Sequence, residues 1–351
     1  MRIKIIIYEI NTITYDYLSI EYVIYLIIES ILICFYRKHI KCIIHVNGIR
    51  GKSTITRLID SSLREFNYRV MSKTTGTIPT IIDVNNNEIE IKRFGPSNIR
   101  EQIRMLKKAY KDNVDYLVIE CMAVNPQLQK VIEENILKAN ICIISNVRED
   151  HIKEMGDNLE ELAIALSNTT PSNGYLIINK NNQFKNIFED KCIKMNSKLV
   201  LSDDYNLDTF DTFKDNIEVA LKVADILNLD KNKYLLGMSK YKKDVGAFVE
   251  LSRSNSLLLN GFSINDIDSI KIVYDSFKNK YKLDDITLLI NNRSDRASRT
   301  LSLLNIFKFI KFKEVILTGD NVDYCKRYIG KNYKGVKVHT INSIEELDKY
   351  K

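Results

Sequence analysis

Short apolar runs alternate with longer amphipathic segments along most of the chain after residue 40. The helical segments include STITRLIDSSLREF, and the apolar runs have the length and β-branched content of buried strands. These runs are CIIHV (42–46), DYLVIE (115–120), ICIIS (141–145) and YLIIN (175–179). Buried strands that alternate with helices predict an α/β fold, in which helices cover both faces of a parallel sheet.

A second, smaller series of apolar runs begins near residue 247. Its expected strands are SLLLNGF (256–262), ITLLINN (286–292), EVILTGD (314–320) and GVKVHTI (335–341). Helical patterns separate them, so we predict a second, Rossmann-like α/β domain after the linker GMSKYKKDVG (237–246). The predicted parts are therefore an N-terminal segment (1–39), a central domain (40–240) and a C-terminal domain (247–351).

The N-terminal segment has a different pattern. The stretch YLSIEYVIYLIIESILICFY (17–36) has about the length needed to cross a bilayer. Arg37 and Lys38 follow at once, which predicts membrane association with the rest of the chain at the cytoplasmic face. Glu29 would lie inside the bilayer, which argues against a helix that crosses it completely. A helix that lies on a membrane or on a protein surface is the open alternative.

Composition narrows the function classes. The chain has 351 residues, 45% of them hydrophobic, and a formal net charge of +7. The charge fits a lysine-rich solvated surface or attraction to polyanions such as ATP, acidic lipid or an acidic polymer. Six scattered cysteines without Cys-x-x-Cys spacing argue against a zinc site or a disulfide framework. We find no signature of nucleic-acid binding.

The stretch HVNGIRGKSTITRL (45–58) predicts a phosphate-binding loop between a strand and a helix. Gly51 lets the backbone approach a phosphate, Lys52 can reach the β- and γ-phosphates, and the Ser53 hydroxyl can bind Mg²⁺. Val46 stands where the common G-x-x-x-x-G-K-[ST] loop has its first glycine, and Gly48 takes over that part. The predicted nucleotide-binding residues here are Asn47, Gly48, Arg50, Gly51, Lys52, Ser53 and Thr54.

Further candidates follow other strands. Glu120 ends an apolar run, where a buried carboxylate needs a cleft or a cation, so we predict a Mg²⁺ ligand. His151 follows the run 141–145 with acidic neighbours that can orient its ring, and we predict that it shares a second metal ion with Glu120. Thr75, in the loop SKTTGTIPT, suits a phosphate or metal loop. The alternatives are a helix-capping Glu120, a structural His151 and an ordinary polar turn.

These motifs in this order, HVNGIRGKSTITRL, KTTGT, ECMAVNP and NVREDH, resemble the Mur ligase superfamily. More closely they resemble the ligase subunit of poly-γ-glutamate synthase, the CapB or PgsB type, and so do NGFSINDIDS and NNRSDRASRT in the second half. The resemblance covers most of the chain after residue 40.

The resemblance implies an ATP-dependent amide ligase with ATP and Mg²⁺ as cofactors. ATP phosphorylates a carboxylate, and an amine attacks the resulting acyl phosphate. Lys52 and Ser53 would hold the phosphates and the first Mg²⁺, while Glu120 and His151 would hold the second. The second half resembles a mobile domain that closes over the nucleotide. Its candidate nucleotide-binding residues are Asn265, Asp266, Arg293 and Arg296, and solvated surface arginines are the alternative for the last two.

The implied substrates are glutamate, joined through its γ-carboxylate, and poly-γ-glutamate. The implied partners are small membrane subunits of a synthase and export complex. Leu166 stands where many Mur-type ligases have a carbamylated lysine, so the metal site needs another ligand. The loop follows directly after the apolar segment, which argues against a domain for a UDP-sugar. Two rival hypotheses are a folylpolyglutamate synthase or other Mur-type ligase, and a membrane-anchored ATPase of an export complex.

Overall fold

The computed structural model divides into two compact units, Met1–Val245 and Gly246–Lys351, and each is described by itself. The residues that it describes are 2–76, 78–93, 95–148, 155–205, 214–244, 249–253, 256–261, 264, 267–281, 286–294, 300, 303–343 and 345–346.

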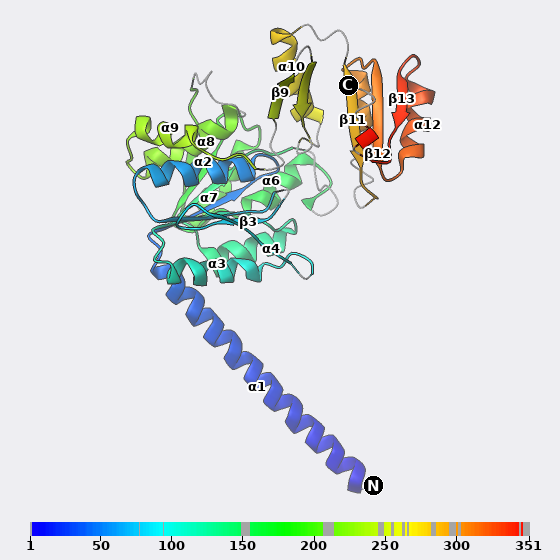
Figure 1. The fold of residues 1–351 in the computed structure, drawn as a ribbon. Helices are drawn as coiled ribbons and strands as arrows, with labels where there is room; N and C mark the ends of the chain where they lie inside the picture. The colour runs from blue at the N-terminus through cyan, green and yellow to red at the C-terminus, as the bar shows by residue number, and fades with distance from the viewer. Residues whose placement is uncertain are drawn as a thin grey trace. The chain divides into compact units, whose positions relative to one another are not determined.

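The first unit is built on one eight-stranded sheet with the order β4-β3-β2-β5-β1-β6-β7-β8 (Figure 1). Its strands are β1 (Cys42–Asn47), β2 (Val70–Thr74), β3 (Thr80–Ile82), β4 (Glu88–Glu90), β5 (Tyr116–Glu120), β6 (Ile141–Ile144), β7 (Tyr175–Ile178) and β8 (Lys198–Leu201). The six strands from β2 to β8 in this order are parallel, which confirms the predicted parallel sheet. The antiparallel edge formed by β3 and β4 was not predicted.

Helices cover both faces of this sheet, as the alternating pattern predicts. On one face lie α2 (Lys52–Glu65), α8 (Lys214–Ile226) and α9 (Lys231–Ser239). On the other face lie α3 (Arg100–Lys111), α4 (Pro126–Val131), the π-helix η1 (Ile132–Leu137), α6 (Leu159–Ser167) and α7 (Lys185–Met195). Successive residues of β1 alternate between the two cores, because side chains of a strand point to opposite faces.

The strand order puts β1 at the centre, between β5 and β6. The chain builds the sheet first on one side of β1 and then on the other. Ligands of such α/β sheets bind at the carboxyl ends of the strands, where the order reverses. The loop after β1 and the ends of β5 and β6 therefore form the expected ligand-binding edge.

The N-terminal segment forms one long helix, α1 (Arg2–Lys38). Its last turns pack on the first unit, where Ile33 is buried in the core cluster of α3 and η1. Glu29, the residue that weakens a span, pairs with Arg100 of α3. Among the described residues, no helix combines the length and the apolar character that crossing a membrane requires.

The second unit carries two small sheets. Strands β9 (Val249–Arg253) and β10 (Ser256–Asn260) form an antiparallel pair. Strands β11 (Thr287–Asn292), β12 (Glu314–Gly319) and β13 (Lys337–Thr340) form a parallel sheet. The helical elements with described bounds include α10 (Ile267–Lys280), the 3₁₀ helix η3 (Asn305–Lys308) and α12 (Val322–Asn332). All four predicted strands are present, but the first of them pairs with β9 and not with the parallel sheet.

Candidate active site

The loop between β1 and α2 has the backbone of a phosphate-binding loop. Gly48 and Gly51 have φ angles of 119° and 82°, in the region that favours glycine. A Cβ on Gly48 would lie 2.1 Å from Ser145 Oγ, and one on Gly51 would lie 2.3 Å from Asn216 Oδ1. Both positions therefore require glycine, and the loop keeps its backbone open toward the N-terminus of α2.

A residue from the neighbouring strand fixes this loop. The Arg50 amide donates to Asn146 Oδ1 at 3.0 Å, and Asn146 Nδ2 donates to the Arg50 carbonyl at 3.0 Å. The Ile49 amide donates to the Asn146 carbonyl at 3.2 Å. Asn146 follows β6, so the end of that strand holds the loop in shape. The sequence gives no local signal for this role, because the pair is 96 positions apart.

Lys52 lies folded over the loop. Its ammonium donates to the Gly48 carbonyl at 2.8 Å, and it makes no ion pair in the part of the chain that the structure describes. The side chain is half-buried. An ammonium with three donors and a neutral partner is available to an anion that enters the loop.

Glu120 ends β5 beside the loop, and its carboxylate is 3% exposed. Ser53 Oγ and the Thr75 amide both donate to Oε2 at 2.7 Å, and Thr75 Oγ1 donates to Oε1 at 2.7 Å. These hydrogen-bonding donors are all uncharged. A buried carboxylate with neutral partners keeps a strong preference for a cation.

Asp244 reaches the same place from the end of the first unit. A Cβ on Gly76 would lie 2.5 Å from Asp244 Oδ2 and 2.9 Å from Ser53 Oγ, so the carboxylate and the hydroxyl lie close together. Asp244 Oδ1 is buried and has no hydrogen-bond partner among the described residues, while Arg57 Nη2 lies 3.7 Å away. The sequence interpretation placed Asp244 in a linker and missed this position.

The ligand types at this edge suit a small divalent cation. Carboxylate and hydroxyl oxygens are the protein ligands that Mg²⁺ prefers, and it usually keeps several waters and binds substrate phosphates as well. Glu120, Ser53, Thr75 and Asp244 fit such a partial ligand set. A group of three or more His, Cys, Asp or Glu side chains with metal-ligand geometry is not found among the described residues. Leu166 of α6 is fully buried in the core, and its apolar side chain supplies no ligand.

The remaining predicted residues fall into three groups. Asn47 is buried and donates to Gln129 Oε1 at 3.0 Å and Thr169 Oγ1 at 3.1 Å, so it braces the end of β1. Thr54 is half-buried in the first turn of α2, and Arg293 is exposed directly after β11 in the second unit. His151, Asn265, Asp266 and Arg296 lie outside the described residues.

An ionic network lies behind Glu120. Lys73 is fully buried, and its ammonium lies 3.0 Å from Glu101 Oε2 and 3.1 Å from Gln102 Oε1. Burial lowers the pKa of Lys73, although Glu101 opposes the shift. Burial works against the charged form of Glu101, but Arg93 and Lys73 lower its pKa to about 2. Gln102 Nε2 donates to the Glu120 carbonyl at 3.4 Å, which links the network to the end of β5.

A second buried ionic pair lies deeper in the sheet. His45 Nδ1 lies 2.8 Å from Glu133 Oε2 of the π-helix η1, and both side chains are almost completely buried. Burial disfavours the imidazolium, but the nearby Cys121 side chain and the hydrogen bond to Glu133 outweigh it and raise the pKa of His45 to about 9. Glu133 Oε1 also accepts from the Ala139 amide at 2.8 Å. This pair was not predicted from the sequence.

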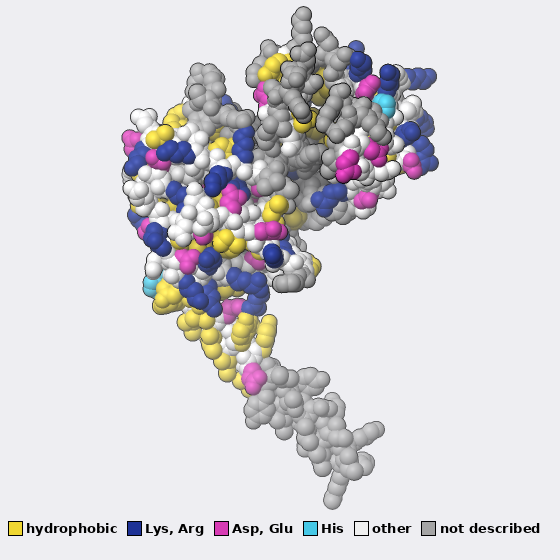
Figure 2. Space-filling model, viewed as in Figure 1, with side chains coloured by type: hydrophobic (Ala, Val, Ile, Leu, Met, Phe, Trp, Pro, Cys, Tyr) yellow, Lys and Arg dark blue, Asp and Glu magenta, His cyan; other side chains and the backbone are white. Residues whose placement is uncertain are grey.

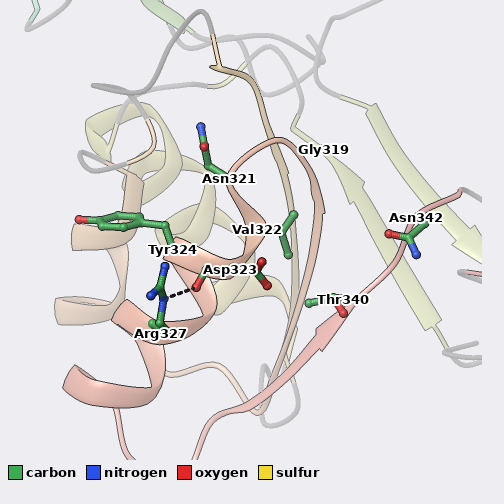
Figure 3. Close-up of a pocket in the computed structure, with 8 residues that line it drawn as sticks. All are labelled: Gly319, Asn321, Val322, Asp323, Tyr324, Arg327, Thr340 and Asn342. Atoms are coloured by element: carbon green, nitrogen blue, oxygen red, sulfur yellow. Dashed lines mark hydrogen bonds between the residues drawn. The ribbon is translucent and has the colours of Figure 1, made fainter.

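The second unit has a cavity of about 540 Å³ at the carboxyl ends of β12 and β13 (Figure 3). It is lined by Gly319, Asn321, Val322, Asp323, Tyr324, Arg327, Thr340 and Asn342. Arg327 Nε donates to the Asp323 carbonyl at 3.3 Å. None of the predicted site residues that the structure describes lines this cavity.

Two family models match the chain. The Mur ligase middle domain matches residues 46–254, and the poly-γ-glutamate synthase CapB C-terminal domain matches residues 245–349. The chain is 36% identical over 296 residues to "PGA synthase CapB" of Bacillus subtilis (strain 168), which covers 80% of this chain and 75% of that protein. It is 33% identical over 300 residues to "Capsule biosynthesis protein CapB" of Bacillus anthracis, with 79% of this chain and 63% of that protein covered.

Solved structures share the fold at low sequence identity. Folylpolyglutamate synthase of Mycobacterium tuberculosis, complexed with ADP, has a TM-score of 0.69 at 13% identity and covers 92% of this chain and 85% of its own. Bifunctional folylpolyglutamate synthase/dihydrofolate synthase of Yersinia pestis c092, complexed with AMPPNP and Mn ion, has a TM-score of 0.67 at 11% identity. It covers 92% of each chain. At this identity the likeness establishes the fold and not the substrate.

Proposed function

The chain belongs to the Mur ligase family, in its poly-γ-glutamate synthase CapB branch, and we propose that it forms the γ-amide bonds of poly-γ-glutamate. It is an ATP-dependent ligase that joins an acid to an amino acid and produces ADP and phosphate. One observation of the structure carries the proposal: Glu120, Ser53 and Thr75 form a polar cluster beside a loop whose two glycines and Lys52 ammonium suit a triphosphate.

The reaction runs in two steps. The γ-phosphorus of ATP forms a bond to an oxygen of the glutamate γ-carboxylate, its bond to the β,γ-bridging oxygen breaks, and ADP leaves. The amine nitrogen of the incoming glutamate then attacks the acyl carbon, inorganic phosphate leaves, and the amine proton passes to solvent. Positioning and charge neutralisation supply most of the rate acceleration in such transfers.

The residues of the loop bind and orient the triphosphate. Backbone amides at the N-terminus of α2 point at the phosphates, and Lys52 exchanges its bond to the Gly48 carbonyl for a phosphate oxygen. Asn146 holds the loop in this shape through its three bonds to Ile49 and Arg50. The loop is thus preorganised before ATP arrives.

Glu120 and Ser53 are proposed to hold Mg²⁺ together with the phosphates, and Asp244 supplies a second carboxylate at this position. A bound Mg²⁺ neutralises charge on the transferred phosphoryl group. Thr75 keeps the Glu120 carboxylate in place through two hydrogen bonds of 2.7 Å. We keep His151 as a proposed further ligand, and Asn265, Asp266, Arg293 and Arg296 as proposed nucleotide-binding residues.

We also propose that α1 associates the chain with the cytoplasmic face of a membrane, next to small membrane subunits. The exposed apolar side chains of α1 include Tyr22, Val23, Ile24, Tyr25, Leu26, Ile27 and Ile28, which are consecutive and therefore cover all sides of the helix. A helix that is apolar all round needs apolar surroundings. Arg37 and Lys38 in its last turn fit the preference for positive charge on the cytoplasmic side.

Hydroxylamine trapping tests the ligase proposal. The full chain, in membranes with its neighbouring subunits, is incubated with Mg-ATP, glutamate and hydroxylamine. We expect γ-glutamyl hydroxamate and ADP in equal amounts, both dependent on glutamate. Lys52→Ala is the matched control, and we expect it to lower both products on the order of 10³-fold while the thermal unfolding curve stays unchanged.

The other outcomes identify the rival functions. ADP release that ignores glutamate, without hydroxamate, would support an ATPase of an export complex. Hydroxamate formation that requires a pteroyl substrate would support a folylpolyglutamate synthase. AMP in place of ADP would contradict an acyl-phosphate mechanism altogether.

A further inference from the structure

The helix α3 presents a row of basic side chains away from the sheet. Glu101, Gln102, Met105, Leu106 and Ala109 are buried against the core. The exposed residues recur at intervals of four, three and four positions, which places them on one side of the helix. They are Arg100, Arg104, Lys107 and Lys111.

Three of these cations have no acidic partner. Arg100 pairs with Glu29 of α1. Arg104, Lys107 and Lys111 make no ion pair with any residue that the structure describes, and we call these three residues the α3 basic face. A row of unpaired like charges on one helix face creates a local positive potential that attracts anions.

The apolar helix α1 runs directly alongside this face. The rings of Phe35 and His39 lie 5.0 and 4.9 Å from the ring of Tyr110 near the C-terminal end of α3. Near the N-terminal end of α3, Tyr25 and Glu29 bond to Arg100. Figure 2 shows Lys and Arg side chains gathered on the first unit where the apolar surface of α1 leaves it.

We propose that the α3 basic face binds anionic phospholipid headgroups while α1 enters the apolar layer beside it. The inference rests on the proposed membrane association of α1 and adds a lipid class and an orientation to it. Cationic side chains next to an inserted apolar helix lie at headgroup depth, where an anionic leaflet attracts them. The side of the first unit that carries α3 then faces the membrane.

Continuity with α1 favours a lipid surface over a soluble polyanion. A polyanion would satisfy Arg104, Lys107 and Lys111 but would leave exposed side chains such as Ile27 and Ile31 in water. An anionic bilayer satisfies both surfaces at once, because it offers phosphate groups and hydrocarbon side by side. A single anionic bilayer therefore accounts for both the α3 basic face and the exposed apolar side chains of α1.

Vesicle partitioning tests the proposal on the full chain. Binding is measured by co-sedimentation with vesicles of phosphatidylcholine alone and of phosphatidylcholine with phosphatidylglycerol. We expect tighter binding to the anionic vesicles. The variant R104Q/K107Q/K111Q should lose about fivefold per cation, on the order of 100-fold in all, on anionic vesicles and be unchanged on neutral ones.

A matched control removes three charges from α9 on the opposite face of the sheet. K231Q/K233Q/K240Q changes the net charge equally, and we expect it to keep the preference for anionic vesicles. Retained ATP turnover in both triple variants shows that they are folded. Equal losses of binding to anionic vesicles in the two variants would mean that net charge alone determines the binding, and this would overturn the proposed role of the α3 basic face.

Further outcomes separate this proposal from the one on which it rests. If the wild type binds both vesicles equally, and R104Q/K107Q/K111Q binds them as tightly as the wild type, only the proposed role of the α3 basic face is overturned. Absence of binding to either vesicle would overturn the membrane association of α1 as well. Loss of binding to soluble polyglutamate in the α3 variant, with vesicle binding intact, would assign the face to the polymer and overturn the lipid proposal.

Discussion

Two of the buried glutamates of the first unit have different partners: Glu120 lies at the carboxyl edge of the sheet and Glu133 in its interior. Glu120 accepts hydrogen bonds from two hydroxyls and one amide, and no cation among the described residues is bonded to it. Glu133 is bonded to His45, whose pKa is raised, and to the Ala139 amide. A carboxylate without a cationic partner is costly to bury. Glu120 at the sheet edge would therefore be stabilised by a bound cation, whereas Glu133 in the interior already has His45 as its partner.

The comparison teaches which buried charge serves stability and which serves function. A partnered charge contributes to folding and leaves little for a ligand. Under our proposal, the unpartnered Glu120 lowers stability, and the protein regains that free energy when a metal and a nucleotide bind beside it. We therefore expect substitution of Glu120 to weaken metal binding without loss of stability, and substitution of Glu133 to lower stability without loss of metal binding.

Glu120→Gln should have the largest effect on the reaction. We expect ligation to fall about 10²- to 10³-fold, because the amide oxygen can still accept from Ser53 Oγ and the Thr75 amide but the side chain cannot supply charge to the metal. Mn²⁺ titration followed by electron paramagnetic resonance should show weakened binding in the presence of a non-hydrolysable ATP analogue. The free energy of unfolding should stay the same or rise. A variant that unfolds more easily and still binds Mn²⁺ would reverse our assignment of Glu120.

Glu133→Gln should show the opposite pattern. Removing this partner leaves the buried His45 without its counter-ion, and we expect a loss of about 3 kcal/mol in the free energy of unfolding. Chemical denaturation measures this loss. Mn²⁺ affinity at 10 °C, where the variant remains folded, should match that of the wild type. A weakened metal site with unchanged stability would place Glu133 in the function of the site.

The His45–Glu133 pair also predicts a dependence of stability on pH. The folded-state pKa of His45, about 9, lies above the ordinary value of 6.5. The stabilisation is therefore complete below about pH 6.5 and is lost as pH rises through 9, by roughly 3 kcal/mol in total. Urea unfolding at several pH values between 6 and 10 measures the slope. Glu133→Gln should flatten it, and an equal slope in both proteins would assign the titration to another group.

Asp244→Asn should have the smallest effect. Its carboxylate lies beside Ser53 but is shared with Arg57, so we expect Mn²⁺ affinity to fall about tenfold, or about 1.4 kcal/mol. The matched control Asp203→Asn removes an exposed carboxylate that pairs with Lys222, and it should leave Mn²⁺ affinity unchanged. Equal Mn²⁺ affinity in wild type and Asp244→Asn would show that Asp244 serves only to hold Arg57.

The sequence by itself determined the secondary-structure elements and the predicted phosphate-binding loop, because both depend on residues that are close together in the sequence. Apolar runs of four to six residues became β1, β5, β6 and β7. The positions of Gly48, Gly51, Lys52 and Ser53 follow from a motif within six residues, and Glu120 was predicted because a buried carboxylate at the end of a strand needs a cleft or a cation. Each of these inferences needs only the period of a strand or the geometry of one turn.

Only the tertiary structure decided which distant residues complete the site. Asn146 clamps a loop 96 positions before it, His45 and Glu133 are 88 positions apart, and Arg100 bonds to Glu29 across 71 positions. Asp244 reaches Ser53 from a segment that was predicted to be a linker. Such contacts depend on the order in which strands assemble, and that order is set by the packing of the whole unit and not by any short stretch of sequence.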